Sequence, residues 1–468
     1  MKKYFKIFSA TTFQIICNQL FGLLFFVLLS SDVSKDIFGD LNWSIAVSVT
    51  FSVILTFGFD NIVVRKVASG NDTGNKISGT YLSHTVVISF VCISMLMLFW
   101  LLFPAFFINH NLFICIFIST LLTFISGPFK QLAVGMEKFW HFAIMNVICN
   151  FIRIAGFIVM IAFNKINVFN ISFLFIASSG IELSLCFIFT YGILKKPLKT
   201  VFNIKLYISL IKESLPQTGT VLLDSAFARM DWILMGILST RMLTADYSFS
   251  YKAFESSRLP LLIIAPILLP KLSRIYSNEE NLKQENIDQL NSLWKAESII
   301  CVMIPLLLNI CWVDIVNLLT HNKYGFETKW VYMVLSMGLP MLFISNYLWT
   351  IAFAKGRYKL TFVISAVVTI SNIILNIILI PRYNAVGAAI ASTSSIFIQV
   401  ILYAANVREK QLNVSLFDFV KTFLIAGVII FGMQYISLFW LLKVCIAVII
   451  FFLFMMPTRV FRYFKTIK

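Results

Sequence analysis

Charged residues are scarce in this chain of 468 residues. Asp, Glu, Lys and Arg together make up 13% of it, whereas a soluble domain carries about 25%. Hydrophobic residues make up 59%, and the mean hydropathy is +0.88. This composition excludes an ordinary soluble domain and predicts an all-α protein that crosses a membrane many times.

The chain also lacks the residue patterns of metal sites, disulfide frameworks and hydrolytic active sites. Its eight cysteines form no Cys-x-x-Cys pair, and its four histidines form no His-x3-His pair. No Gly-x-Ser-x-Gly, Walker or His-Glu-x-x-His motif occurs. We therefore expect no metal, no cofactor and no enzymatic activity, and an ATP-driven pump is excluded.

Acidic residues are fewer than basic ones, with 21 Asp and Glu against 38 Lys and Arg and a net charge of +17. The basic residues lie between apolar runs, as the positive-inside rule predicts for a membrane protein, so nucleic acid is not an expected partner. With the N-terminus placed in the cytoplasm, 27 of the 38 basic residues fall on inner segments between spans, Lys130 among them, and 7 fall on outer ones. We therefore predict that both termini are cytoplasmic.

Apolar runs long enough to cross a bilayer recur along the whole chain. A spanning helix needs about 20 apolar residues, and the runs predict about fourteen such helices. The first follows a basic opening, MKK. Its apolar core is longer than that of a signal peptide, so we expect it to be retained as a span.

A polar segment near residues 195–214 divides the first twelve predicted spans into six and six, as in transporters built from two repeated halves. The predicted parts are an N-terminal lobe at 1–200, a C-terminal lobe at 201–410, and two extra spans with a basic cytoplasmic tail at 411–468. A faint internal repeat supports the division, since AVGMEKFWHF resembles AKGRYKLTFV. That match pairs Gly135 with Gly356.

Three charges interrupt the seventh predicted span, although a charge at the bilayer centre costs about 3 kcal/mol. On a helix with 3.6 residues per turn, Asp224 and Asp231 are nearly eclipsed, and Arg229 points roughly 150° away from them. Arg229 therefore cannot pair with either acid along its own helix. We expect polar surroundings on two sides of this span.

The eighth predicted span carries a single charged stripe. Lys252, Glu255 and Arg258 follow one another at steps of three, which places all of them within an arc of about 120°. Intramembrane charges of this kind normally face a bundle interior or a watery cavity. The stripe is therefore a candidate lining for a transport path.

Other polar residues inside the predicted spans allow two interpretations. Arg153 and Glu182 lie at similar depth on consecutive spans, and we expect them to form an ion pair. Gln14 and Asn18 are four residues apart on the first span and share a face that suits sugar hydroxyls. Interhelical hydrogen bonds are the alternative for these two amides.

The stretch NIILNIILIPRYNAVGAAIASTSS, residues 372–395, resembles the junction of spans 11 and 12 in the O-antigen and capsule flippases (Wzx-type) of the MOP superfamily. Residues 55–70, 231–247 and 259–274 also resemble that family, as does GMEKFWHFAIMNVI. Together these stretches cover most of the chain.

This resemblance implies two six-helix lobes around a central cavity lined by spans 1, 2, 7 and 8, with two peripheral C-terminal helices. It implies a bacterial inner-membrane flippase of lipopolysaccharide or capsule biosynthesis. Such a protein carries an undecaprenyl-diphosphate-linked oligosaccharide from the cytoplasmic to the periplasmic leaflet by alternating access, and other membrane proteins of glycan assembly are its possible partners.

The resemblance also implies roles for charged residues. Arg229, Lys252 and Arg258 would bind the diphosphate, and Asp224, Asp231 or Glu255 would couple transport to protons or sodium or act in gating. Since the charges of spans 7 and 8 sum to zero, the surplus positive charge lies at the inner mouth, where it suits capture of an anionic headgroup. Those inner-mouth cations are Arg65, Lys66, Lys271 and Arg274.

Two other functions remain open. A MATE-type multidrug or cation antiporter of the same fold is favoured by the two acids of span 7, but span 1 holds no acid for ion coupling. A membrane enzyme of glycan assembly would usually need a large outer loop, and no outer segment is long enough to supply one.

Overall fold

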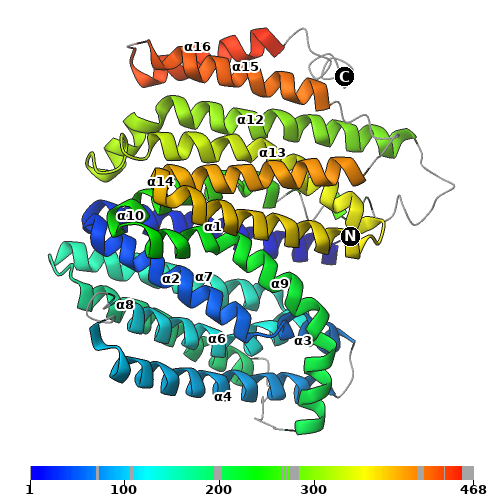
Figure 1. Ribbon diagram of the computed structural model, residues 1–468. Helices are drawn as coiled ribbons and strands as arrows, with labels where there is room; N and C mark the ends of the chain where they lie inside the picture. The colour runs from blue at the N-terminus through cyan, green and yellow to red at the C-terminus, as the bar shows by residue number, and fades with distance from the viewer. Residues whose placement is uncertain are drawn as a thin grey trace. The chain divides into compact units, whose positions relative to one another are not determined.

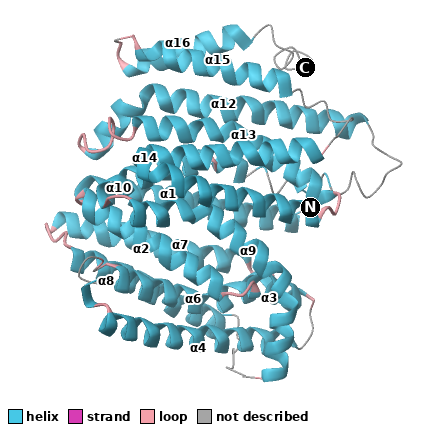
Figure 2. Cartoon of the chain, viewed as in Figure 1, coloured by secondary structure: helices cyan, strands magenta, loops and turns pink. Residues whose placement is uncertain are grey.

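The computed structural model describes residues 2–69, 73–105, 110, 112–193, 203–262, 264, 268–269, 272, 284–407, 416–436 and 438–455. Within these ranges the chain is helical, the helices are joined by short loops, and no strand occurs (Figure 2). This confirms the predicted all-α fold class.

The helices follow one another along the chain as labelled in Figure 1. Their bounds are α1 Lys2–Asp32, α2 Lys35–Leu55, α3 Phe59–Ala68, α4 Thr73–Leu102, α6 Phe113–Gly135, α7 Phe139–Ala162, α8 Val168–Ile188, α9 Ile204–Leu238, α10 Arg241–Ser257, α12 Gln284–Thr320, α13 Lys329–Ala354, α14 Tyr358–Asn406, α15 Leu416–Gln434 and α16 Trp440–Met455.

Nine of the helices in the described ranges are long and apolar enough to cross a membrane. One of them, α14, is two helices joined at a kink, where Asn384 has the non-helical angles φ 50° and ψ −131°. The charged helices α9 and α10 and the shorter apolar helices α15 and α16 lie where the sequence predicts four further spans. The protein is therefore a multi-pass membrane protein.

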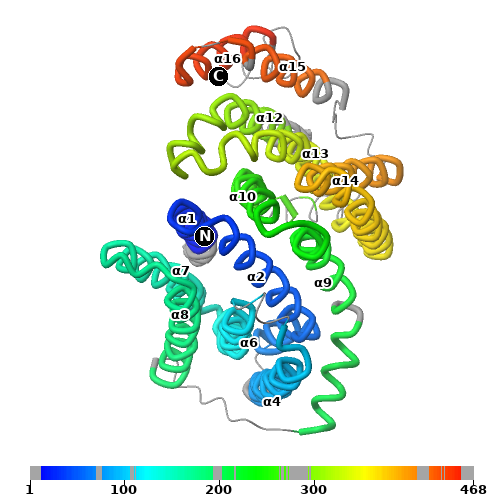
Figure 3. The backbone as a smooth tube through the Cα atoms, turned by 60° about the vertical axis from the view of Figure 1, so that its left-hand side comes forward, coloured from blue at the N-terminus to red at the C-terminus, as the bar shows by residue number. Residues whose placement is uncertain are grey.

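The chain divides into two compact units, residues 1–245 and residues 246–468. In the first unit, α6 packs against α2, α3, α4 and α8, and α1 packs along α7. In the second unit, α12 packs along α13, α13 packs along α14, and α15 and α16 pack along α12 (Figures 1 and 3).

The core of the first unit is built from aromatic and branched side chains where these helices meet. One cluster joins α4, α6, α7 and α8 through Leu82, Leu132, Met145 and Cys186. Another joins α3, α4 and α9, and its members include Phe59, Ile62, Val63, Tyr81 and Leu210. Burial of these apolar side chains holds the first turns of α9 against α3 and α4.

α9 begins in the polar segment that was predicted to divide the two halves. Asn203 caps its N-terminus by accepting hydrogen bonds from the backbone N–H groups of Lys205 and Leu206. Leu210 is buried in the first unit, whereas Ile204 and Ile208 are exposed. The first turns of α9 therefore pack on one face and leave apolar side chains on the other.

The two sequence stretches of the faint internal repeat form the same kind of helix end. After α6 the N–H of Lys138 donates to the carbonyl of Ala133, and after α13 the N–H of Arg357 donates to that of Ala352. The left-handed residue is Glu137 (φ 57°) in one and Gly356 (φ 71°) in the other. The structural equivalence therefore pairs Gly356 with Glu137, two residues away from the Gly135 suggested by the sequence match.

α2 approaches the junction between α9 and α10 so closely that only glycine fits at one position. A Cβ atom on Gly39 would lie 2.0 Å from the carbonyl oxygen of Arg241. Because that atom belongs to the backbone, a side-chain rotation cannot relieve the clash.

We predict that Gly39→Ala lowers the thermal unfolding midpoint of the protein in detergent. Overpacking costs about 1–3 kcal/mol, more than the roughly 1 kcal/mol that alanine gains over glycine within a helix. The matched control is Gly180→Ala in α8, where no atom lies within 4 Å of the new Cβ. Equal midpoints for the two variants would show that the contact between α2 and Arg241 is not tight.

Candidate functional site

The charged part of α9 lies in the first unit and combines exposed and buried groups. Asp224 is exposed, Arg229 is half-buried, and Asp231 is only 1% exposed. The guanidinium carbon of Arg229 lies 5.5 Å from the ring centroid of Trp232, within the range of a cation–π contact. The two acids, nearly eclipsed on a regular helix, therefore differ in environment.

The charged stripe of α10 lies in the second unit. The Nζ atom of Lys252 lies 2.6 Å from Oε2 of Glu255, so these two charges neutralise each other. Arg258 follows at the end of the helix, and its Nε atom is buried with no hydrogen-bond partner in the described part of the chain. The stripe thus contains one internal ion pair and one guanidinium with unused donor capacity.

A buried ion pair lies inside the first unit, between α6 and α8. Lys130 pairs with Glu182, whose side chain is 3% exposed, and Ser126 donates a hydrogen bond of 3.0 Å to the same carboxylate oxygen. Ser126 and Lys130 are four residues apart and so share a face of α6. Sequence reasoning placed Lys130 in an inner loop, whereas the structure places it within the apolar helix α6.

This pair corrects the expectation that Glu182 binds Arg153. Arg153 instead donates hydrogen bonds to the hydroxyls of Ser178 (3.1 Å) and Ser179 (3.4 Å). Its guanidinium carbon lies 4.5 Å from the ring centroid of Phe175. Because α6 brings a lysine to Glu182, the arginine of α7 is satisfied by hydroxyls and an aromatic face of α8.

The two amides predicted to face sugars lie on α1, which packs along α7. Asn150 of α7 donates a hydrogen bond of 3.4 Å to the side-chain oxygen of Asn18. Asn18 therefore makes the interhelical bond that was the alternative interpretation. Gln14 is half-buried.

Two of the four predicted inner-mouth cations belong to an ion-pair cluster, and the other two lie outside the described residues. Arg65 and Lys66, at the end of α3, both pair with Glu213 of α9, and the Lys66 contact is 2.7 Å long. Arg65 is 68% exposed at its side chain. Lys271 and Arg274 lie outside the described residues.

Several polar residues that the sequence did not single out connect α3, α4, α6 and α9. The hydroxyl of Tyr81 donates a hydrogen bond of 2.8 Å to Asp60. Burial raises the pKa of the Asp60 carboxyl above its ordinary value, while hydrogen bonds from Tyr81 and Gln131 and the charge of Lys130 oppose the rise. These partners link Asp60 to the buried pair between α6 and α8.

His84 of α4 connects α2 and α9. Its Nε2 atom lies 2.8 Å from the carbonyl oxygen of Leu55, and its Nδ1 atom lies 3.0 Å from the hydroxyl of Tyr207. Since a carbonyl oxygen only accepts, Nε2 donates to Leu55, and a neutral imidazole would accept from Tyr207 through Nδ1. A lone histidine in an apolar run gives no sequence signal for such a contact.

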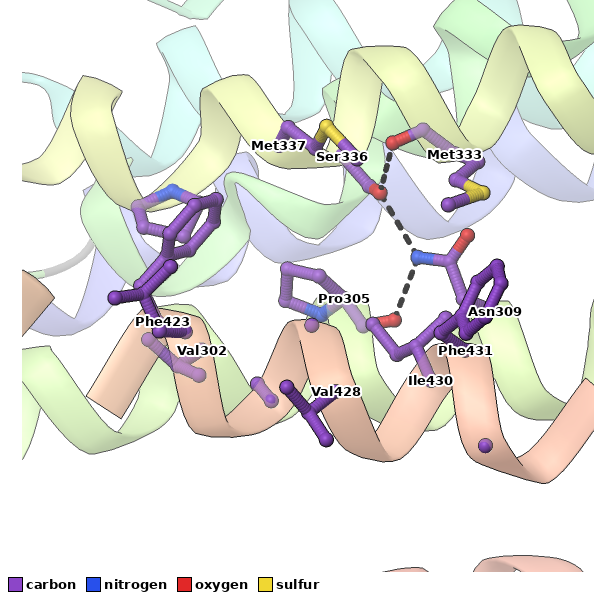
Figure 4. Close-up of a pocket in the computed structure, with 15 residues that line it drawn as sticks. Val302, Pro305, Asn309, Met333, Ser336, Met337, Phe423, Val428, Ile430 and Phe431 are labelled. Carbon is purple, nitrogen blue, oxygen red and sulfur yellow. Dashed lines mark hydrogen bonds between the residues drawn. The ribbon is translucent and has the colours of Figure 1, made fainter. Parts of the chain in front are cut away.

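The second unit contains an apolar cavity of about 560 Å³ between α12, α13 and α15 (Figure 4). Its walls include Val302, Pro305, Met337 and Phe431, and its polar feature is a hydrogen bond of 2.8 Å from Asn309 to Ser336. α15 is one of the two helices predicted to be peripheral additions. It therefore forms one wall of a cavity that is lined mainly by apolar side chains.

No group of His, Cys, Asp and Glu that could hold a metal ion occurs among the described residues. The fold defines a class of polytopic, all-α membrane proteins, and transporters of the MOP superfamily share this fold. Solved structures of transporters share the fold. The alignment with the lipid II flippase MurJ, in an inward closed conformation, covers 98% of this chain and 99% of MurJ, with a TM-score of 0.70 and 19% sequence identity. The alignment with an inward-facing MATE multidrug transporter covers 90% of this chain and 96% of the transporter, with a TM-score of 0.66 and 11% identity. The alignment with the MATE transporter DinF-BH covers 88% of this chain and 96% of DinF-BH, with a TM-score of 0.62 and 14% identity.

The chain belongs to the polysaccharide biosynthesis protein family, whose pattern matches residues 5–276. It is also 28% identical over 148 residues to the capsular polysaccharide biosynthesis protein CapF of Staphylococcus aureus. That alignment spans 30% of this chain and 35% of CapF, about a third of the relative's length. Family and fold together confirm the resemblance to MOP-type polysaccharide flippases.

We predict that Glu182→Gln lowers the thermal unfolding midpoint, because it leaves Lys130 buried without its counter-ion. Breaking a buried pair from one side costs about 3–5 kcal/mol. The double variant Lys130→Met with Glu182→Gln removes the charge as well and should recover much of the loss. A double variant as unstable as the single one would contradict the assignment of the pair.

Proposed function

We propose that this protein is a flippase that carries an undecaprenyl-diphosphate-linked oligosaccharide, an O-antigen or capsule repeat unit, from the cytoplasmic to the periplasmic leaflet of a bacterial inner membrane. Membership of the polysaccharide biosynthesis family and the transporter fold support this function. Transport proceeds by alternating access, and both termini lie in the cytoplasm.

The observation that carries the proposal is that the Nε atom of Arg258 is buried without a hydrogen-bond partner among the described residues. A buried guanidinium nitrogen without a partner costs free energy unless a ligand completes its hydrogen bonds. Arginine donates to phosphate through two parallel N–H groups, so a diphosphate suits this position. Arg258 is therefore the primary diphosphate ligand of the second unit.

Arg229 and Lys252 take secondary roles in binding the diphosphate. Arg229 contacts the face of Trp232, which leaves its N–H groups for an anion. Lys252 is held by Glu255, so it becomes available only when a phosphate displaces that carboxylate. That displacement would change the charge balance of the stripe, which makes this pair a means of sensing bound substrate.

The lobes of the proposed transporter are residues 1–200 and 201–410, and residues 411–468 add two further spans. At the inner mouth, Arg65 and Lys66 capture the anionic headgroup, and Glu213 restrains both side chains until it arrives. Lys271 and Arg274 are proposed to take part in the same capture, and Gln14 and Asn18 to contact the sugars.

The apolar cavity of the second unit suits the lipid part of the substrate. Its rim includes Leu424, Val428 and Phe431, whose side chains are 60%, 73% and 56% exposed. Apolar side chains exposed on a membrane-spanning helix face hydrocarbon, so the cavity opens toward lipid. A segment of an isoprenoid chain fills such a space without any polar cost.

The MATE-type antiporter remains the alternative function, because MATE transporters share the fold. The exposed Asp224 and the buried Asp231 on α9 are the residues that would bind a cationic drug or a coupling ion. Drug susceptibility of a deletion strain separates the two functions. A strain that loses surface glycan and keeps its drug resistance supports the flippase.

We predict that Arg258→Ala reduces transport of the lipid-linked glycan about tenfold or more, because a hydrogen bond to a charged group contributes about 1.5–3 kcal/mol. Arg258→Lys should recover only part of the rate, since lysine lacks the planar fork. Surface glycan in a complemented deletion strain measures the effect at matched expression. Arg382→Ala, at an exposed arginine, is the control. Normal glycan in the Arg258→Ala strain would refute the diphosphate assignment.

We also predict that Gly427→Leu weakens binding of the lipid-linked substrate, because a leucine side chain would fill part of the cavity beside α15. Nothing lies within 4 Å of a Cβ at Gly427, so the variant is expected to fold. Gly180→Leu in α8 is equally unhindered and lies outside the cavity. Binding by purified protein in detergent compares the two, and equal affinities would exclude the cavity as a lipid site.

A further inference from the structure

α12 carries an acid that the proposed transport path does not use. Glu297 is 2% exposed, and its Oε1 atom has no hydrogen-bond partner among the residues that the structure describes. It is the first residue of a 24-residue apolar span. Unlike Glu182 and Glu255, it forms no ion pair with any lysine whose side chain the structure describes.

The surroundings of Glu297 are apolar or weakly polar on each helix that packs along α12. On α12 itself, Lys295 precedes Glu297 by two residues, and its side chain lies outside the described part of the structure. Among the described side chains of α12, the thiol of buried Cys301 is the titratable group one turn away. α13 contributes Tyr347, whose ring centroid lies 4.7 Å from that of Trp294, one turn before Glu297. The other described titratable groups on α13, α15 and α16 form no ion pair or hydrogen bond with Glu297; they are Lys329, Tyr332, Lys421, Lys443 and Cys445.

An ionised carboxylate at this position would have neither water nor a counter-charge. Burial of an isolated carboxylate costs many kcal/mol, and such a group takes up a proton instead. The same carboxyl loses its proton once water reaches it. The charge of Glu297 therefore depends on whether α12 is packed as in this structure.

α12 contains a proline, which favours a bend, about two turns beyond this acid. Pro305 lies inside the helix and has no N–H to donate, so the carbonyl of Cys301 lacks the usual helical bond. Cys301 is one turn from Glu297 on the same face. A change of bend at this point would alter the packing around the carboxyl first.

We propose that Glu297 is the site at which this transporter binds and releases a proton in each transport cycle. The packed arrangement holds the neutral carboxylic acid. When α12 bends and water enters, the O–H bond breaks, the proton passes to water, and the carboxylate remains until a proton from the aqueous phase restores the acid. This inference rests on the proposed flippase function, and it names protons as the coupling ion.

Infrared spectroscopy of the purified wild-type protein tests the protonation without any transport. At neutral pH we expect the carbonyl band of a protonated carboxylic acid, and Glu297→Gln should lose it while keeping the wild-type unfolding midpoint. Glu327→Gln, at an exposed outer carboxyl, is the control and should leave the band unchanged. An identical band in wild type and Glu297→Gln would overturn the proposal, whatever the protein transports.

Proteoliposomes with an imposed pH gradient test the coupling. The gradient should change the rate of lipid-linked glycan translocation by about fivefold or more in wild type. It should leave the rate of Glu297→Gln unchanged. If Glu297→Gln responds like wild type, Glu297 is not the coupling site. If wild type translocates no lipid-linked glycan at all, the flippase function fails, and the infrared result still decides whether Glu297 is protonated.

Discussion

The free-energy cost of an unpaired charge inside an apolar helix governs this structure. Each ionised group within the described spans must find a counter-ion, a set of hydroxyls, an aromatic face or a ligand. In the first unit, Glu182 has a counter-ion in Lys130. Arg153 has the hydroxyls of two serines and an aromatic face. In the second unit, Nε of Arg258 and Oε1 of Glu297 have no hydrogen-bond partner among the described residues, and the two proposals concern these residues.

The two units differ in their buried polar groups, and we propose that they differ in their part in transport. In the first unit, Asp60, Tyr81, Lys130 and Glu182 form a buried polar network that connects four helices. Such a network favours a rigid body. In the described part of the second unit, Nε of Arg258 and Oε1 of Glu297 are buried without a hydrogen-bond partner, and α12 contains a proline beside an apolar cavity. The second unit is therefore proposed to supply the primary diphosphate ligand and the bend, while Arg229, Arg65 and Lys66 act from the first unit.

Much of the fold could be predicted from the sequence, because hydropathy sets the length and number of spanning helices. The charged faces of α9 and α10 also followed from helical periodicity. The partner of Glu182 did not follow, because Lys130 lies near the end of an apolar run and was assigned to a loop. Contacts such as Asp60 with Tyr81 join residues on different helices, and one sequence gives no information on which helices pack together. Glu297 was missed for a similar reason, since it lies at the boundary between a polar segment and a span.

The most direct measurement of the central claim is the accessibility of the α9 and α10 charges to water and to substrate. Arg229→Cys and Arg258→Cys would be placed in a variant whose eight native cysteines are replaced, with Val428→Cys as the lipid-facing control. If both positions line a hydrated transport path, a charged thiol reagent labels them, a lipid-linked diphosphate protects them, and position 428 stays unlabelled. Unreactive cysteines at 229 and 258, or labelling that the diphosphate lipid leaves unchanged, would contradict this account.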